Sequence, residues 1–300
     1  MKNIIMIASA ITLLIPEIAC CMRAFTLLAP EVANCKRALD FKLITVDGIT
    51  YQSGKDGNAS AKPTTTASIY FPRNLVSESG IVWEVLIASG NYCYKDHFCK
   101  ICIPANAQKI MCGCFNEYVN LNIITFEAGS QLTSILESGF SRCSSLASIC
   151  IPSSVEKMER RCFEKCKHLS SIKFESSSKL AVIEGLAFSD CFSLKSVCLP
   201  SSVQMIGWRC FGGCENLGDI TFEFGSQLAK IGGEAFYCCF SLTSIRIPFS
   251  VEKIGKKCFY SCSSLSIITF EAGSKLKTIK ADAILEGTEV VGCPSSIPGM

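Results

Sequence analysis

The feature that most constrains the fold is an internal repeat with a period of 48 residues. The stretch Ile149–Ser196 returns from Val197, and it recurs upstream from Ile101 and downstream from Ile245 without insertion or deletion. Each unit contains two half-units, of 23 and 25 residues, that share one pattern of apolar positions. A constant period in the twenties is typical of solenoids, in which each repeat packs only against its neighbours. The sequence therefore predicts a repeat solenoid that grows in one dimension.

Within a half-unit, apolar residues first alternate and then return at wider spacing. In the segment from Leu146 to Pro152, alternation places Ile149 and Ile151 inward and Cys150 outward, which predicts a short strand. Pro152 ends that strand because it lacks the N–H that a strand ladder needs. After a turn, two further apolar residues return to the core, and a small residue followed by Phe completes the half-unit.

Two columns of identical residues are expected in the core. The first is an aromatic spine consisting of Phe115, Phe140, Phe163, Phe188, Phe211, Phe236 and Phe259. The second lies three residues after the Phe and consists of Cys143, Cys166, Cys191, Cys214, Cys239 and Cys262. We interpret these cysteines as buried thiols that fill a small apolar slot. Disulfides are the alternative, but stacked neighbours point the same way, and a bridge needs more than proximity.

The outward strand positions are the candidate binding face. They are Cys102, Thr125, Cys150, Lys173, Cys198, Thr221, Arg246 and Thr269. Solenoids use extended faces of this kind to bind partners, although the same residues could be only solvated positions. Glutamates flank this face in every second half-unit, at Glu127, Glu175, Glu223 and Glu271. Because that spacing is roughly 10 Å, we expect a solvated charge row without paired-carboxylate chemistry.

Catalytic, metal and cofactor sites are not predicted. Cysteines such as Cys162 and Cys166 are four residues apart, but these pairs recur with the repeat and bring no fixed His, whereas zinc needs four convergent ligands. His97 and His168 occupy variable positions, which does not favour a Cys–His nucleophile pair. The formal charge of +3 does not favour a nucleic-acid partner, which would require a basic patch or stripe.

The first 21 residues resemble a secretory signal peptide. Lys2 precedes an apolar run, Ile4–Ile15, that is too short to span a bilayer as a helix, and no transmembrane helix is predicted elsewhere. Secretion or display at the cell surface is therefore expected. The alternative is a short amphipathic segment of a cytoplasmic protein, which the cysteine-rich repeats favour because disulfide-free thiols are typical of reducing compartments.

The remaining chain divides by the regularity of its repeats. Residues 22–67 form an N-terminal segment with a link, in which 41–62 predict a β-hairpin that covers the first repeat. Asn58 begins a glycosylation sequon, which has meaning only in a secreted chain. The expected repeat domain is 68–289, with degenerate repeats over 68–100, regular repeats over 101–289, and a C-terminal cap over 290–300.

The repeat closely resembles the BspA-type leucine-rich repeat, whose signature is L-x-x-I-x-I-P-x-S-V-x-x-I-G-x-x-A-F-x-x-C. The segment Leu242–Cys262, LTSIRIPFSVEKIGKKCFYSC, carries nearly all of it. The resemblance implies a leucine-rich-repeat horseshoe or arc. Such an arc has short parallel β-strands on one side and turn or short helical segments on the opposite side.

The same resemblance implies a non-enzymatic protein that binds other proteins. Members of this family are surface antigens and adhesins, so the implied partner is a host matrix or cell-surface protein. An intracellular scaffold that uses the same face is the alternative. One departure from the signature is Cys in place of Ala before the Phe, at Cys114, Cys162, Cys210 and Cys258. The sequence does not specify an oligomeric state or the identity of the partner.

Overall fold

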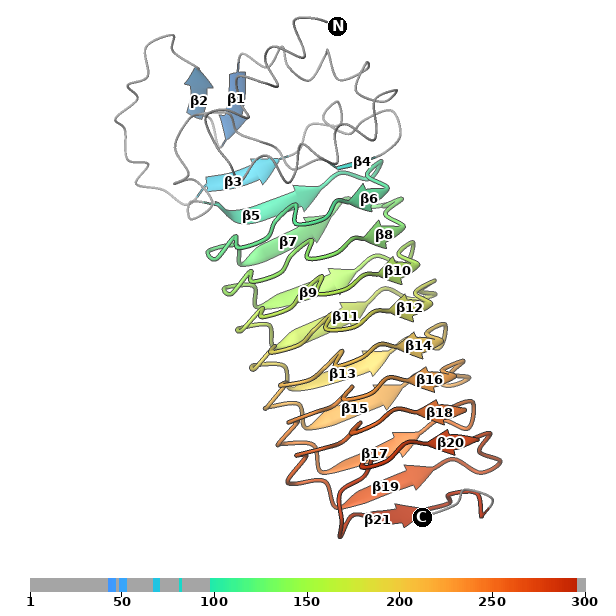
Figure 1. Ribbon diagram of the computed structural model, residues 1–300. Coiled ribbons are helices and arrows are strands. Elements are labelled where there is room, and N and C mark those ends of the chain that lie inside the picture. Colours follow the sequence, from blue (N-terminus) through green and yellow to red (C-terminus); the bar gives the residue numbers. More distant parts are fainter. Residues whose placement is uncertain (1–42, 47–48, 53–66, 71–80, 83–97, 296–300) are drawn as a thin grey trace, which may run out of the picture. The chain divides into compact units, whose positions relative to one another are not determined.

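The computed structural model confirms a parallel β-solenoid. The structure describes residues 43–46, 49–52, 67–70, 81–82 and 98–295. The chain divides into two compact units, one of Met1–Thr45 with Thr50–Ser53 and one of Val46–Ile49 with Gly54–Met300. Within the second unit, each half-unit makes one turn of the solenoid, called a rung here, with one long and one short strand (Figure 1).

The long strands form one side of the solenoid. They are β3 (Ala67–Tyr70), β5 (Phe98–Ile103), β7 (Ile123–Phe126), β9 (Ser148–Ile151), β11 (Ser171–Phe174), β13 (Ser196–Leu199), β15 (Asp219–Phe222), β17 (Ser244–Ile247), β19 (Ile267–Phe270) and β21 (Glu289–Val291). The described pairs among them are parallel, as β9 with β11 illustrates. Ser148 and Cys150 of β9 are exposed whereas Ile149 and Ile151 are buried, which is the predicted alternation of period two.

The short strands form a second ladder. They are β4 (Ile81–Val82), β6 (Lys109–Ile110), β8 (Ser134–Ile135), β10 (Lys157–Met158), β12 (Val182–Ile183), β14 (Met205–Ile206), β16 (Lys230–Ile231), β18 (Lys253–Ile254) and β20 (Thr278–Ile279). Together they make one nine-stranded sheet in which neighbouring rungs are neighbouring strands. From β6 to β18 the inward residue of each short strand, such as Ile183 or Ile231, is buried, whereas Ile279 of β20 is half-buried.

Turns complete each rung. Short helical segments were the alternative expected at this place. The described residues contain no helix, so that alternative is not confirmed. The physical reason is visible at Arg161 and Lys165, whose φ angles of 59° and 60° are left-handed and interrupt any helix. The N–H groups of Arg161, Phe163 and Lys165 instead donate to carbonyl groups of the next rung, over 3.1, 2.8 and 2.8 Å.

The core is a single stack of apolar columns. The seven spine phenylalanines are buried, and consecutive rings lie nearly parallel, with centroids from 5.0 Å apart at Phe115–Phe140 to 5.7 Å at Phe211–Phe236. Each ring therefore contacts the ring above and the ring below. This arrangement buries a continuous apolar column that no rung could bury alone.

Several sequence predictions concern the N-terminal region. β1 (Leu43–Val46) and β2 (Ile49–Gln52) pair in a two-stranded sheet within the segment predicted to be a hairpin. That this hairpin covers the first rung stays a prediction. The signal-peptide segment 1–21, the sequon at Asn58 and His97 lie outside the described residues, as does most of 68–97.

Candidate functional site

The predicted binding face lies along the long strands. Thr125, Cys150, Lys173, Cys198, Thr221 and Arg246 are exposed, and Cys102 and Thr269 are half-buried. The register aligns these residues in neighbouring pairs, which are Cys102 with Thr125, Cys150 with Lys173, Cys198 with Thr221, and Arg246 with Thr269. The eight residues therefore form a row along one side of the solenoid, with side chains of each pair close enough to contact one ligand.

The ladder beneath this row is not continuous. Strands separated by 23 residues pair at four positions, as Ser148–Ile151 do with Ser171–Phe174. Across the 25-residue step from β11 to β13, only Ser171 and Ser196 pair, and the long strands divide into three sheets at β7/β9 and β15/β17. The outward residues are thus presented in two-strand groups.

The charged and thiol groups on this row have identifiable partners. Arg246 Nε donates to Glu271 Oε1 over 3.1 Å. The pKa of the Cys150 thiol is raised, first by burial and then by the Glu175 carboxylate, while Lys173 acts in the opposite direction. Cys150 is therefore a protonated, weak nucleophile near neutral pH. The geometry suits non-covalent contacts.

The flanking glutamates are exposed or half-buried, as a solvated charge row requires, and they also have a structural role that the sequence did not show. Each carboxylate accepts the N–H that follows the proline position of the preceding rung. The donors are Ala105 to Glu127 at 3.1 Å, Ser153 to Glu175 at 2.9 Å, Ser201 to Glu223 at 2.9 Å, and Phe249 to Glu271 at 3.0 Å. The fixed distance of 22 residues between donor and acceptor is a signal that the sequence contained, but alternation alone does not show which groups a carboxylate meets.

The cysteine column has a bonding role that the sequence did not show. All six residues are buried, and each Sγ lies within hydrogen-bond distance of a phenylalanine carbonyl in the preceding rung, as Cys191 does with Phe163 at 3.3 Å. The other contacts are Cys143–Phe115, Cys166–Phe140, Cys214–Phe188, Cys239–Phe211 and Cys262–Phe236. The thiol therefore contributes a weak S–H donor as well as a small apolar volume. The 17 cysteines that the structure describes are free thiols.

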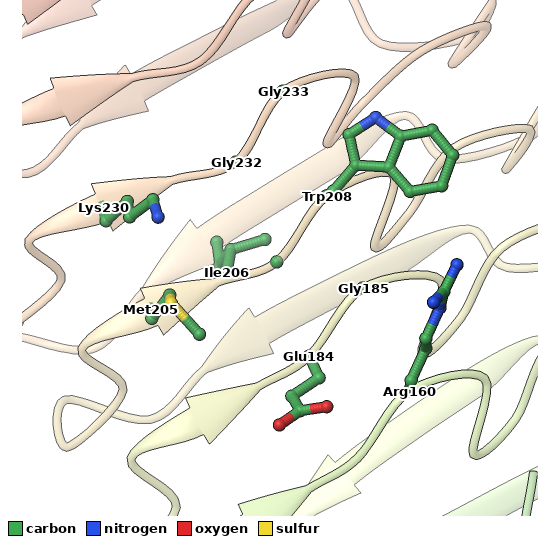
Figure 2. Close-up of a pocket in the computed structure, with 10 residues that line it drawn as sticks. Arg160, Glu184, Gly185, Met205, Ile206, Trp208, Lys230, Gly232 and Gly233 are labelled. Carbon is green, nitrogen blue, oxygen red and sulfur yellow. The ribbon is translucent and has the colours of Figure 1, made fainter. Parts of the chain in front are cut away.

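A second surface lies on the short-strand side. It is an open groove of about 480 Å³ between the rungs of β12, β14 and β16, with a glycine-rich floor. Figure 2 shows Trp208 and Arg160 along one margin, Met205 and Lys230 along the other, and Glu184 between them. Trp208 is 45% exposed, although most large apolar side chains of the array are buried. The repeat pattern of the sequence gave no indication of this surface.

The repeat pattern decides the family. A model described as the BspA type leucine rich repeat region matches six copies, over residues 86–217 and 181–290. The chain belongs to the BspA-type leucine-rich repeat family. A search of curated proteins found no match to it.

Solved leucine-rich repeat proteins are similar to this BspA-type chain. The T. pallidum leucine rich repeat protein is 27% identical over 52% of this chain and 77% of its own, with a TM-score of 0.44. The pneumococcal vaccine antigen PcpA is 20% identical over 65% and 75%, with a TM-score of 0.42. A leucine-rich repeat protein from Bacteroides ovatus is 19% identical over 84% and 69%, also with a TM-score of 0.42.

The departure from the BspA-type signature is accommodated inside the core. Cys114, Cys162, Cys210 and Cys258, which replace the signature alanine, are all fully buried. Cys162 Sγ lies 3.9 Å from the Ala187 carbonyl oxygen, and burial raises the pKa of this thiol. In the described part of the chain, no three His, Cys, Asp or Glu side chains converge as metal ligands, and no helix could cross a membrane.

Proposed function

We propose that this BspA-type repeat protein is a non-enzymatic adhesion protein, secreted or held at the cell surface, that binds a host matrix or cell-surface protein through its long-strand face. The observation that carries the proposal is the contrast between inward and outward positions. Inward positions of the long strands are Ile, Val, Leu or Phe in every rung, whereas the outward row contains Cys, Thr, Lys and Arg. The fold requires only exposure at those outward positions, so their identity is available for recognition.

The dimensions of the face support a protein partner. Eight rungs stacked at roughly 5 Å give a row on the order of 40 Å long. A standard protein interface needs about 800 Å² on each partner. Four-residue strands at roughly 3.3 Å per residue give the row about 500 Å², and the flanking turns would supply the rest. Pairs such as Cys150 with Lys173 would supply polar contacts, and the flanking turns would supply the rim.

An intracellular scaffold that uses the same face is the second candidate. The observation that favours it is the thiol state, because the 17 described cysteines are free and Cys150 and Cys198 are exposed. Unpaired exposed thiols are typical of a reducing compartment. The two candidates differ in location and share the binding face.

Location is tested in the native cell. Intact cells are treated with a membrane-impermeant amine label, the full chain is recovered, and its N-terminus is sequenced. Labelled protein lacking its first residues supports secretion or display. An unlabelled chain that retains Met1 and fractionates with cytosol supports the scaffold and contradicts the adhesion protein.

The face is tested with the purified full chain on immobilised fibronectin, laminin and collagen. The double variant Lys173→Glu with Arg246→Glu reverses two exposed charges of the row, and we expect it to weaken binding at least about tenfold. The matched control is Lys179→Glu, at a turn beside the row, which should bind within about twofold of the parent. Equal loss in both variants would contradict the assignment of this face.

A further inference from the structure

We propose that the groove on the short-strand side is a second binding site, and that it takes an acidic polysaccharide whose sugars carry carboxylate groups. The groove lies on the opposite side of each rung from the long-strand face, so this inference does not depend on the proposed function. It rests on a comparison between rungs of the same molecule, because one column of lysines occurs in two different settings.

In the first setting, the lysine is neutralised by its own chain. Lys157 Nζ lies 3.2 Å from Glu159 Oε1 and 2.8 Å from Glu184 Oε1. The hydrogen bond that Lys157 donates to Glu184 is the main cause of the raised pKa of Lys157. The two carboxylates occupy the residue after the short strand in two successive rungs, β10 and β12.

In the second setting, lysines occupy the same position of the short strand, but no carboxylate follows the strand. Lys230 and Lys253 occupy the column of Lys157 on β16 and β18, and they are direct register partners. The position that holds Glu159 and Glu184 is a glycine in the next three rungs, at Gly207, Gly232 and Gly255. Among the described residues, neither Lys230 nor Lys253 makes an ion pair. Adjacent like charges are unfavourable, so an external anion would stabilise this pair.

The charge balance of the chain changes at the same place. Residues 98–229 contain twelve Lys or Arg and twelve Asp or Glu, a net charge of zero. Residues 230–280 contain eight Lys or Arg and three Glu, a net charge of +5. An excess of one sign along a surface attracts ligands of the opposite sign over several ångströms.

The acidic residues near the groove are already engaged. Glu184 is held by Lys157, Glu234 lies 3.9 Å from Arg209, and Glu252 lies 2.8 Å from Lys277. Among the described residues, none of these carboxylates forms an ion pair with Lys230 or Lys253, although after Lys277 the neighbouring Lys253 also helps to lower the pKa of Glu252.

The floor of the groove is closely packed backbone. Gly207 packs against Gly185 N, and Gly255 packs against Gly233 N, so these N–H groups face the glycine of the next rung. The floor therefore supplies a surface without side chains of its own, and the lysines supply the charge.

The exposed tryptophan favours a sugar over a peptide. The Trp208 ring leans over Gly233, with Cδ1 3.5 Å from the place that a Cβ there would occupy, and it forms one wall of the groove (Figure 2). The flat indole can stack against the C–H face of a pyranose ring. A peptide that adds as a strand requires an open sheet edge, but β14 and β16 lie inside the nine-stranded sheet with neighbours on both sides.

Titration calorimetry of the full chain with three polymers tests the ligand class. Oligogalacturonate carries both sugar rings and carboxylates, dextran carries only rings, and poly-L-glutamate carries only carboxylates. We expect oligogalacturonate to bind, to weaken as salt rises, and to bind at least about tenfold more tightly than either control. Equal binding of dextran would overturn the acidic requirement, equal binding of poly-L-glutamate would overturn the sugar requirement, and no binding would overturn the site.

Matched variants test the location. Lys230→Gln with Lys253→Gln should weaken oligogalacturonate binding at least about fivefold, and Trp208→Ala should weaken it about fivefold to tenfold. Lys109→Gln removes a lysine of the same column on β6, which does not line the groove, so it should leave binding unchanged. Urea midpoints near that of the parent show that each variant is folded. Loss in Lys109→Gln, or in the long-strand variant Lys173→Glu with Arg246→Glu, would place the ligand elsewhere and overturn the proposal.

Discussion

The two strand ladders of the solenoid follow one repeat but differ in continuity. The short strands join into a single nine-stranded sheet, whereas the long strands divide into three separate sheets (Figure 1). The backbones are also closer on the short-strand side. A Cβ on Gly207 would lie 2.4 Å from Gly185 N, whereas a Cβ on Gly218, beside the long strand β15, would meet nothing nearer than Ser241 O at 3.5 Å.

This difference in continuity and backbone spacing gives the two sides of the solenoid separate roles. The side with two-residue strands sets the stacking distance, because its rungs touch backbone to backbone at the glycines. The side with four-residue strands has more freedom, since the two extra residues of each 25-residue half-unit lie in its turns. The long-strand side can therefore vary its outward residues without disturbing the stack.

The largest expected effect acts on the core that both sides share. Burial raises the pKa values of thiols such as Cys166, Cys191 and Cys210 well above their ordinary value. The folded state therefore holds these protons when the unfolded chain has released them, and stability is full below the ordinary thiol pKa and falls as pH rises above it. Each such thiol should cost about 1.4 kcal/mol at one unit above that value, near pH 9.5.

Urea unfolding at about pH 7.5 and about pH 9.5 measures this loss. Cys191→Ala removes one titrating thiol, so its stability should fall less steeply with pH than that of the parent. After correction for base-catalysed exchange, hydrogen-exchange protection should fall in both ladders together at about pH 9.5. Constant stability across this pH interval would show that the thiols do not titrate differently in the two states.

The next effect removes one ring from the shared spine. Phe188 is fully buried, and its ring centroid lies 5.5 Å from that of Phe163 and 5.4 Å from that of Phe211. Phe188→Ala should lower the free energy of unfolding by about 3–5 kcal/mol, because it leaves a cavity and breaks the stack. Thermal and urea denaturation measure the change. An unchanged melting temperature would contradict the spine.

A glycine pair distinguishes the two sides directly. Gly207→Ala should destabilise the chain by about 1–3 kcal/mol, because the new Cβ would press on the backbone of the preceding rung. Gly218→Ala places the same methyl group on the long-strand side, where there is room, and should be neutral or slightly stabilising. Urea midpoints of the two variants provide the comparison. Equal changes of stability in the two variants would contradict the conclusion that the rungs pack more closely on the short-strand side than on the long-strand side.

The smallest expected effect concerns the turn that joins the two sides. Glu175 Oε2 accepts the Ser153 N–H over 2.9 Å, so Glu175→Ala should cost about 0.5–1.5 kcal/mol. Glu156→Ala is the control, since Glu156 is exposed and its side chain makes no bond within the described residues. If both variants lose the same stability in urea, the carboxylate contributes only through its charge.

Most of the fold was predictable because the repeat fixes it many times over. Period-two alternation predicted the buried Ile149 and Ile151 and the exposed Cys150, and the fixed phase of Phe188 predicted its column. The backbone hydrogen bonds between the turns of successive rungs were not predictable in this way. The left-handed positions of these turns are occupied by Arg161 and Lys165, residue types that give no indication of a positive φ.

The surfaces were harder to predict than the core. Alternation showed that Lys173 and Arg246 point outward, but it could not show that the short-strand side carries a groove. The groove depends on Gly207 and Gly232, which occupy the positions that Glu159 and Glu184 occupy two rungs earlier. A comparison of corresponding surface positions between rungs would have found this change from Glu to Gly. A search for the pattern that all rungs share does not show it, because it considers only the positions that stay the same.

The turns have a consequence for longer arrays. From Phe115 to Phe259, the N–H of each spine Phe donates to a carbonyl of the following rung. Elsewhere in each rung the crossing N–H groups point the other way, as Glu159 N–H does to Ile135 O and Glu175 N–H to Ile151 O. The peptide dipoles, about 3.5 D each, therefore oppose one another along the stacking axis and do not add as they do in an α-helix. An array of this design can gain rungs without building up the electrical polarity of a long helix.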